Sequence, residues 1–150
     1  MDNPATIHAS AVLIGRDAVL IRGSAGTGKS RLAWRLIDAA GKPPLAFVRL
    51  VADDRVHLEV LGERLLARPS ASLAGLIEIR GLGIRRVPYE AVAAVGLVID
   101  LAAADAERLP RPKAAETVVD GVRLPRLAVA AGIEPLPMVL AFLATAQACD

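Results

Sequence analysis

An α/β domain with a mixed sheet is the fold class that this 150-residue sequence predicts. Strand-like and helix-like segments alternate along the first third of the chain, and strand-like segments dominate the rest. A glycine-rich loop stands between an apolar strand and an amphipathic helix, an order typical of α/β domains. Hydrophobic residues make up 54% of the chain and aromatic residues only 3%, so we expect an aliphatic core. This length suits one domain, and we expect that domain to span residues 1–150.

The N-terminal elements are predicted as two strands and a helix. Residues 7–15 and 18–22 are apolar runs separated by a polar turn, which predicts two antiparallel strands. Residues 29–40 place apolar side chains at the 3.6-residue period of a helix, and Gly41 is a natural helix stop. The loop at 23–28 therefore joins a buried strand to an amphipathic helix.

The rest of the chain is predicted mainly as strands. Residues 55–61 and 64–68 form the two arms of a predicted hairpin. A proline at position 88 predicts the first turn of a short helix over 88–94. The same signals predict strands at 46–52, 76–80, 95–101 and within 118–129, a flexible loop at 81–83, a polar loop at 106–113, and a C-terminal helix at 135–147.

Composition and charge narrow the possible partners and location. The net charge of +2 comes from 18 basic and 16 acidic residues spread along the chain, without a basic block. Together with the scarcity of aromatic side chains, this argues against nucleic-acid and membrane partners. The single cysteine, Cys149, excludes an intramolecular disulfide. No signal peptide or membrane-spanning run is visible, so we expect a cytoplasmic protein.

The glycine-rich loop carries a phosphate-binding motif. Its glycines let backbone N–H groups converge on phosphate oxygens, and the following helix presents its positive end to the same anion. The lysine supplies a point charge for the β- and γ-phosphates, and the serine hydroxyl is a ligand for Mg²⁺. The motif predicts binding of ATP or GTP, whereas the alternative is a glycine-rich turn that binds nothing. It reads Gly23-Ser24-Ala25-Gly26-Thr27-Gly28-Lys29-Ser30 and matches G-x-x-x-x-G-K-[ST] without a mismatch.

Three further polar features are candidates for the same site. Asp53 and Asp54 follow a predicted strand, where one carboxylate can hold Mg²⁺ and the other can accept a proton; the alternative is a solvated turn. Adjacent strand residues point to opposite faces, so we expect the two to have different roles. Glu78 lies in an apolar strand. It is a candidate metal ligand, and the alternative is a surface residue, alone or paired with Arg80. His8 either approaches the phosphate loop across the first hairpin or is an ordinary terminal histidine.

Together these segments resemble the catalytic domain of bacterial HPr kinase/phosphorylase. That family has an early histidine, a glycine-rich loop ending in GKS, then V/I-A-D-D-R-V and I-E-V-R-G-L-G-I. This chain has His8, the loop at 23–30, VADDRV at 51–56 and IEIRGLGI at 77–84, in the same order. The resemblance covers residues 7–86.

The resemblance implies a P-loop nucleotide-binding domain with a mixed central sheet, of the PEP-carboxykinase-like, HPr kinase C-terminal-domain type. It also implies an ATP- and Mg²⁺-dependent kinase that phosphorylates a serine of the phosphocarrier protein HPr, regulates the phosphotransferase system and assembles as a homo-oligomer, a hexamer in the family. Asp54, with Asp53 beside it, matches the family's acidic pair, one member of which accepts the proton in phosphorylation and donates it in dephosphorylation. Asp54 is the expected base, and Asp53 is the alternative. The other implied roles are His8 as the active-site histidine, Lys29 as the loop lysine, Ser30 and Glu78 as magnesium ligands, and Arg108 as a catalytic arginine.

Two departures from the family pattern qualify this expectation. The family's V-R-P-G-R-N segment is missing, and residues 122–127 and 132–135 stand in its region. That segment is associated with dephosphorylation and subunit contacts, so we expect phosphorylation to dominate. The N-terminal domain of the long form is also missing, which indicates the short form found in some proteobacteria. The alternatives are a nucleotide-binding regulatory module with reduced or lost transfer activity, and a small-molecule kinase with the same loop.

Overall fold

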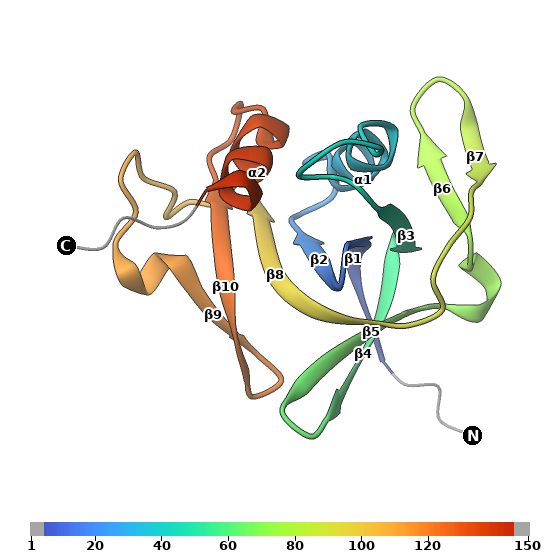
Figure 1. The fold of residues 1–150 in the computed structure, drawn as a ribbon, viewed down its shortest axis with the longest axis horizontal. Coiled ribbons are helices and arrows are strands. Elements are labelled where there is room, and N and C mark those ends of the chain that lie inside the picture. The colour runs from blue at the N-terminus through green and yellow to red at the C-terminus, as the bar shows by residue number, and fades with distance from the viewer. Residues whose placement is uncertain (1–4, 146–150) are drawn as a thin grey trace.

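The computed structural model describes residues 5–145, which form a mixed sheet of eight strands, a separate two-stranded hairpin and two α-helices (Figure 1). The strands of the main sheet are β1 (Thr6–Ile14), β2 (Asp17–Arg22), β3 (Val48–Ala52), β4 (Arg55–Leu61), β5 (Arg64–Pro69), β8 (Ala93–Leu101), β9 (Glu116–Val119) and β10 (Val122–Val129). The separate hairpin is β6 (Leu76–Ile79) and β7 (Gly83–Arg86), the α-helices are α1 (Lys29–Asp38) and α2 (Pro135–Ala144), and short 3₁₀ turns occur at Ala71–Leu73 and Pro112–Ala115.

The strand pairings of the main sheet form a closed circuit. β1 pairs antiparallel with β2, β3 and β4, and β4 continues into β5. The long curved strand β8 pairs antiparallel with β5 and runs parallel to both β2 and β10. As a result, the carboxyl ends of β2 and β8 lie side by side, and the phosphate loop begins at the end of β2.

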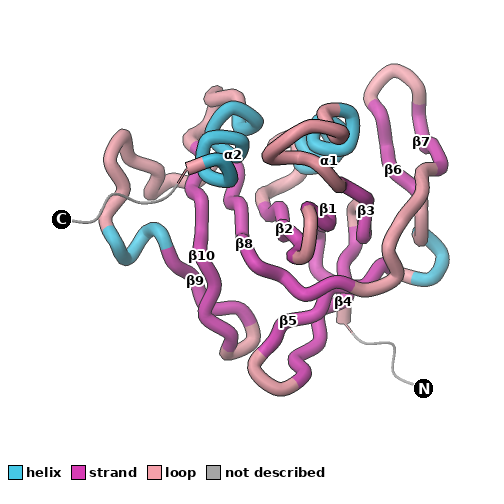
Figure 2. Tube along the Cα trace, viewed as in Figure 1, coloured by secondary structure: helices cyan, strands magenta, loops and turns pink. Residues whose placement is uncertain are grey.

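The two faces of β2 build two different parts of the core. Ala18 and Leu20 point into a cluster formed with β4, β5 and β9, whereas Val19 and Ile21 point toward the helices. This alternation is expected of a strand that is buried on both faces. Figure 2 shows both helices on the same side of the sheet. Helix α1 buries its apolar stripe there and is thereby held against the strand that precedes its loop.

Most predicted elements are present with small shifts at their ends, but one predicted helix is wrong and one strand was not predicted. The predicted helix over 88–94 is extended chain instead. There the Glu90 N–H donates to the Leu50 carbonyl oxygen over 2.8 Å, so the segment satisfies its backbone along β3 and not within a helix. The predicted loop over 81–83 is only the turn of a hairpin whose second strand, β7, was not predicted.

The helix boundaries also differ from the sequence expectation. Helix α1 ends at Asp38, two residues before the predicted end, and α2 ends at Ala144. The last residues of the predicted C-terminal helix, like Cys149, lie outside the described residues.

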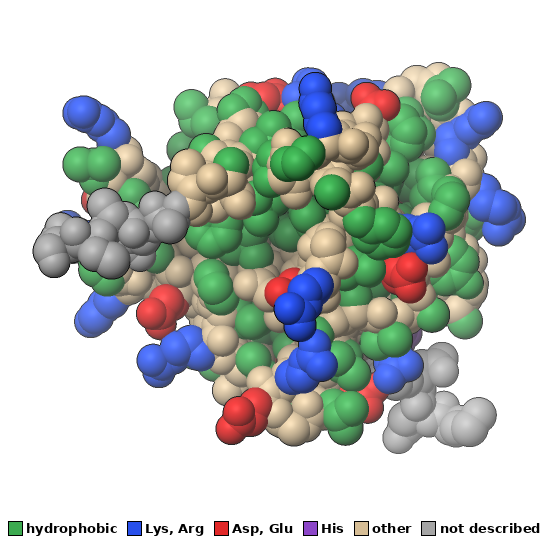
Figure 3. All heavy atoms as spheres, in the orientation of Figure 1, with side chains coloured by type: hydrophobic (Ala, Val, Ile, Leu, Met, Phe, Trp, Pro, Cys, Tyr) green, Lys and Arg blue, Asp and Glu red, His purple; other side chains and the backbone are tan. Residues whose placement is uncertain are grey.

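Charge on the surface agrees with the charge pattern in the sequence. Lys and Arg side chains are dispersed over the face drawn in Figure 3 and do not gather into one block. Among residues 5–145, no helix combines the length and the apolar character that a bilayer crossing requires.

Candidate active site

The phosphate loop presents backbone N–H groups at the start of α1. Gly26 has φ +83° and Gly28, the N-cap of α1, has φ +98°, so both adopt the left-handed conformation that glycine tolerates. No side chain caps the helix, and its first turn carries no acidic residue. The free N–H groups and the positive end of the helix dipole therefore favour an anion at this position.

Close packing at the start of the loop explains why position 23 is a glycine. A Cβ added to Gly23 would lie 2.5 Å from Thr27 Oγ1 and 3.3 Å from Leu101 Cβ. Thr27 Oγ1 itself donates to the Ser24 carbonyl oxygen over 2.8 Å. The Lys29 ammonium donates to the carbonyl oxygens of Gly23 (2.8 Å) and Ser24 (3.1 Å), which holds its charge over the loop.

Asp53 is the buried centre of the site, with 4% of its surface exposed. Its carboxylate accepts hydrogen bonds from Ser30 Oγ at 2.7 and 2.9 Å, from Ser10 Oγ at 2.7 Å and from the Glu78 N–H at 3.1 Å. These donors come from α1, β1 and β6, so one carboxylate connects three elements to the end of β3. They also provide the hydrogen bonds that a buried carboxylate needs.

Asp54 has a different environment although it is the next residue. Its φ of +68° turns the chain, and its side chain is 68% exposed. His8 Nδ1 lies 3.8 Å from Asp54 Oδ1, and the imidazole is similarly exposed. The structure thus brings His8 and Asp54 together at the surface, next to the buried Asp53.

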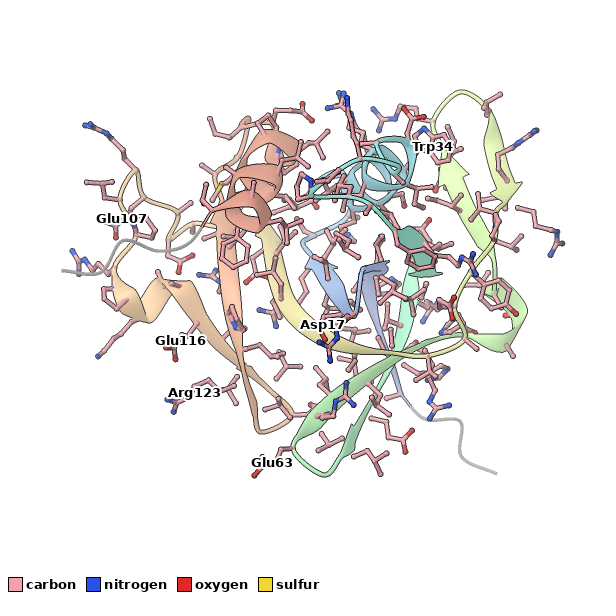
Figure 4. All side chains as sticks on the ribbon, viewed as in Figure 1. Asp17, Trp34, Glu63, Glu107, Glu116 and Arg123 are labelled. Carbon is pink, nitrogen blue, oxygen red and sulfur yellow. The ribbon has the colours of Figure 1, made fainter. Side chains whose placement is uncertain are left out.

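The structure does not bring every predicted site residue to this centre. Glu78 reaches Asp53 only through its backbone N–H; its side chain is exposed, and in the described chain its carboxylate has no hydrogen bond or ion pair. Arg108 is exposed on the loop after β8 and likewise has no such partner within residues 5–145. In Figure 4 its neighbour Glu107 lies on the opposite side of the view from Trp34, which marks α1.

Sequence reasoning missed Ser10. It is fully buried on β1, between Ala9 and Ala11, and its hydroxyl donates to the Asp53 carboxylate. The available signal was a single hydroxyl in an otherwise apolar part of a strand, because such a group needs a buried partner.

A second missed feature is an ion network beside the loop. Arg22 donates to Asp100 from Nε (2.7 Å) and Nη2 (2.9 Å), and Arg126 Nε donates to the same carboxylate over 2.5 Å. Arg126 also forms two hydrogen bonds with Asp105, at 2.8 and 2.9 Å.

Burial alone would raise the pKa of Asp100, but the hydrogen bonds from Arg22 and Arg126 outweigh it and hold that pKa below its usual value. The hydrogen bond from Arg126 lowers the pKa of Asp105 as well.

A cavity of about 210 Å³ adjoins the loop on the side of α2. Thr27, Gly28 and Arg31 line it from the loop and α1, and Glu134 lines it from the start of α2. Glu134 forms ion pairs with Arg35 and, at 3.8 Å, with Arg31. These pairs connect the two helices beside the phosphate loop.

The donor set of the site fits a nucleotide phosphate with a divalent cation. The loop N–H groups and the Lys29 ammonium match phosphate oxygens in charge and hydrogen bonding. The Ser30 hydroxyl and the Asp53 carboxylate are hard oxygen ligands of the kind that Mg²⁺ prefers. The hydrogen bond between them places both at one point. The exposed Asp54 carboxylate is available to take a proton.

Comparison with known proteins identifies relatives of the whole fold. A family model described as HPr Serine kinase C-terminal domain matches residues 1–131. The HPr kinase/phosphorylases of Clostridium tetani and Clostridium acetobutylicum are 35% and 37% identical to the chain over 82 residues, which are 55% of this chain and 25% of each relative. The chain therefore matches about a quarter of the length of these curated relatives. The solved structure of the HPr(Ser) kinase/phosphatase from Coxiella burnetii is similar with a TM-score of 0.72 and 27% identity, over 93% of this chain and 87% of that one.

Proposed function

Because this chain belongs to the family of HPr serine kinase C-terminal domains, we propose that it transfers the γ-phosphoryl group of ATP to a serine hydroxyl of the phosphocarrier protein HPr. The observation that carries the proposal is the pairing of two unlike carboxylates at one strand end. Asp53 is buried and accepts from Ser30 of the phosphate loop, while Asp54 is exposed beside it. Acting on HPr would place the protein in the cytoplasm, the location that we propose for it.

The phosphate loop would bind and orient ATP. Its N–H groups and Lys29 would neutralise charge on the β- and γ-phosphates, which is the main contribution of protein groups in phosphoryl transfer. Ser30 and Asp53 would hold Mg²⁺. Glu78 reaches Asp53 only through its backbone N–H, so we assign its exposed carboxylate no contact with the metal. When bound, this ion would stabilise the negative charge of the phosphates during transfer.

Asp54 would act as the general base. It would take the proton of the serine hydroxyl as the new O–P bond forms and the bond from the γ-phosphorus to the bridging oxygen breaks, leaving ADP. His8, 3.8 Å away, would orient that carboxylate. Asp53 is unsuited to this role because its oxygens already accept from Ser10, Ser30 and Glu78. Arg108 contacts none of these residues in the described structure, and we assign it no step.

Matched carboxamide variants test these roles. With [γ-³²P]ATP and purified HPr, Asp54→Asn should lower the rate of transfer about 10²-fold or more, the usual contribution of a general base, with little change in ATP affinity. Asp53→Asn should instead weaken binding of ATP in the presence of Mg²⁺. Equal loss of binding in both variants would contradict the assignment of Asp54 as the base.

The same assay distinguishes the other possible functions. ATP binding by the unaltered chain without transfer to HPr, or to any protein detected by mass spectrometry, would indicate a regulatory nucleotide-binding module. Transfer to a metabolite would indicate a small-molecule kinase.

A further inference from the structure

We propose that Asp100 is a positioning residue for the phosphate loop, acting through Arg22, Gly23 and the Lys29 ammonium. The inference rests on the proposed function only in assigning ATP to the loop. It concerns the ion network of Arg22, Asp100, Arg126 and Asp105, none of which touches the carboxylates that carry the chemistry.

The network holds the last residue before the loop. Arg22 and Asp100 are partners in the parallel register of β2 and β8, at the carboxyl ends of both strands. The two hydrogen bonds between them, 2.7 and 2.9 Å long, fix the guanidinium in plane with the carboxylate. One residue further on, Gly23 packs against Leu101, the neighbour of Asp100. The end of β8 therefore confines Arg22 and Gly23 together.

This restraint reaches the catalytic lysine through one carbonyl group. The Gly23 carbonyl oxygen, directly after Arg22, accepts a hydrogen bond of 2.8 Å from Lys29 Nζ. A shift of Arg22 would move that carbonyl and with it the ammonium that faces the phosphates. A displacement of about 1 Å at a positioned group is enough to lower a rate by as much as 10²-fold.

Arg126 restrains Asp100 from the other side. Its side chain is 12% exposed, and its guanidinium donates to Asp100, to Asp105 and, at 3.1 Å, to the Ala114 carbonyl oxygen. The network is neutral as a whole, with two arginines and two aspartates. Loss of the Asp100 charge would leave Arg22 without the partner that holds it. Asp105 lies at the solvent-exposed end, where within residues 5–145 its carboxylate forms an ion pair only with Arg126.

The experiment compares Asp100→Asn with Asp105→Asn at the far end of the same network. ATP affinity with Mg²⁺ is measured by titration calorimetry without HPr, at a temperature well below the melting point of each variant. Asp100→Asn should weaken affinity about tenfold, the size of one weakened charge-assisted hydrogen bond from Lys29 to a phosphate. Asp105→Asn should leave affinity within about twofold of the unaltered protein.

A double-mutant cycle separates positioning from stability. Arg22→Gln and Asp100→Asn should each weaken ATP binding, and the double variant should be no weaker than the worse single variant, because both remove one interaction. If Asp100→Asn does not fold, Arg22→Lys keeps the charge without the two-pronged geometry and should show the same loss. A lower melting temperature with unchanged ATP affinity, or equal losses in Asp100→Asn and Asp105→Asn, would overturn the proposal. Intact ATP binding by the unaltered chain without transfer to HPr would refute the proposed function and leave this inference standing.

Discussion

Two neighbouring aspartates show how strongly local environment separates chemically identical residues. Asp53 ends a buried strand and is surrounded by donors, whereas the left-handed conformation at Asp54 directs the next side chain to the surface. A carboxylate surrounded by three hydrogen-bond donors is suited to hold a ligand in place, and an exposed one is suited to exchange a proton. The different roles proposed for the two residues follow from this backbone turn.

Ser10 allows the buried part of the site to be tested separately from catalysis. Ser10→Ala removes one donor to the Asp53 carboxylate and changes the volume of the buried side chain only slightly. Because hydrogen bonds to charged groups contribute about 1.5–3 kcal/mol, we expect the free energy of unfolding in urea to fall by about that amount. Ser72→Ala, at an exposed position, is the matched control and should change it by less than about 0.5 kcal/mol. Equal stability of the Ser10 variant and the control would contradict the hydrogen-bond role.

Among the elements, β10 bears most directly on the direction of the reaction. It occupies the region in which the family has V-R-P-G-R-N, and two of its residues are arginines. Arg126 is held by Asp100 and Asp105, and Arg123 lies 3.8 Å from Glu116 of β9. Figure 4 shows Arg123 beside Glu116, on the β9–β10 hairpin and away from α1. These contacts leave β10 without an arginine directed at the phosphate loop.

We therefore expect phosphorylation of HPr to be faster than its reversal. The reverse reaction transfers the phosphoryl group of phosphoserine to inorganic phosphate, giving pyrophosphate, and the incoming anion needs donors of its own. Serine-phosphorylated HPr would be incubated with the protein, Mg²⁺ and millimolar phosphate, and pyrophosphate release followed. The Clostridium acetobutylicum relative serves as a positive control for the assay. Pyrophosphate release as fast as ATP-dependent phosphorylation would contradict this expectation, because dephosphorylation would then proceed without the V-R-P-G-R-N segment.

At the scale of the whole molecule, the closed circuit of strands joins distant parts of the chain through charged contacts. Arg22 and Asp100 are 78 residues apart and Ser10 and Asp53 are 43 apart, yet both pairs meet beside the loop. Folding of the entire sheet is therefore a condition for assembling the site.

Because of the ion network around Asp100, the free energy of unfolding should fall at acidic pH. The pKa of Asp100 is lower in the folded protein than its usual value, so its stabilising contribution is fully present above about pH 4, the ordinary value for an unfolded aspartate. It is lost as the pH falls through that value toward the folded pKa. Urea unfolding between pH 6 and pH 3 should show a weaker dependence on pH in Asp100→Asn than in the unaltered protein. Asp105→Asn should change the slope less because Asp105 is exposed, and identical slopes for the unaltered protein and Asp100→Asn would contradict the expectation.

The sequence alone predicted the local elements and the family. The strand before the phosphate loop, helix α1 and the β4–β5 hairpin follow from apolar periodicity and turn residues, and the fold class and family are confirmed by the structure and the relatives. Periodicity works for these elements because each is specified by neighbours a few residues away. The roles of the site residues stay predictions, although the structure brings His8, Asp53, Asp54 and Ser30 together.

Only the tertiary structure decided which distant residues meet. The three donors around Asp53 and the register that faces Arg22 with Asp100 depend on strand pairing across the chain. The segment over 88–94 is extended for the same reason, since its backbone finds partners on β3. A register shift of one residue would move every side chain of a strand to the opposite face, and no local pattern specifies it. Both faces of β2 are apolar and buried, so apolar alternation does not select its register, and only the pairing with β8 places Arg22 opposite Asp100 beside the phosphate loop.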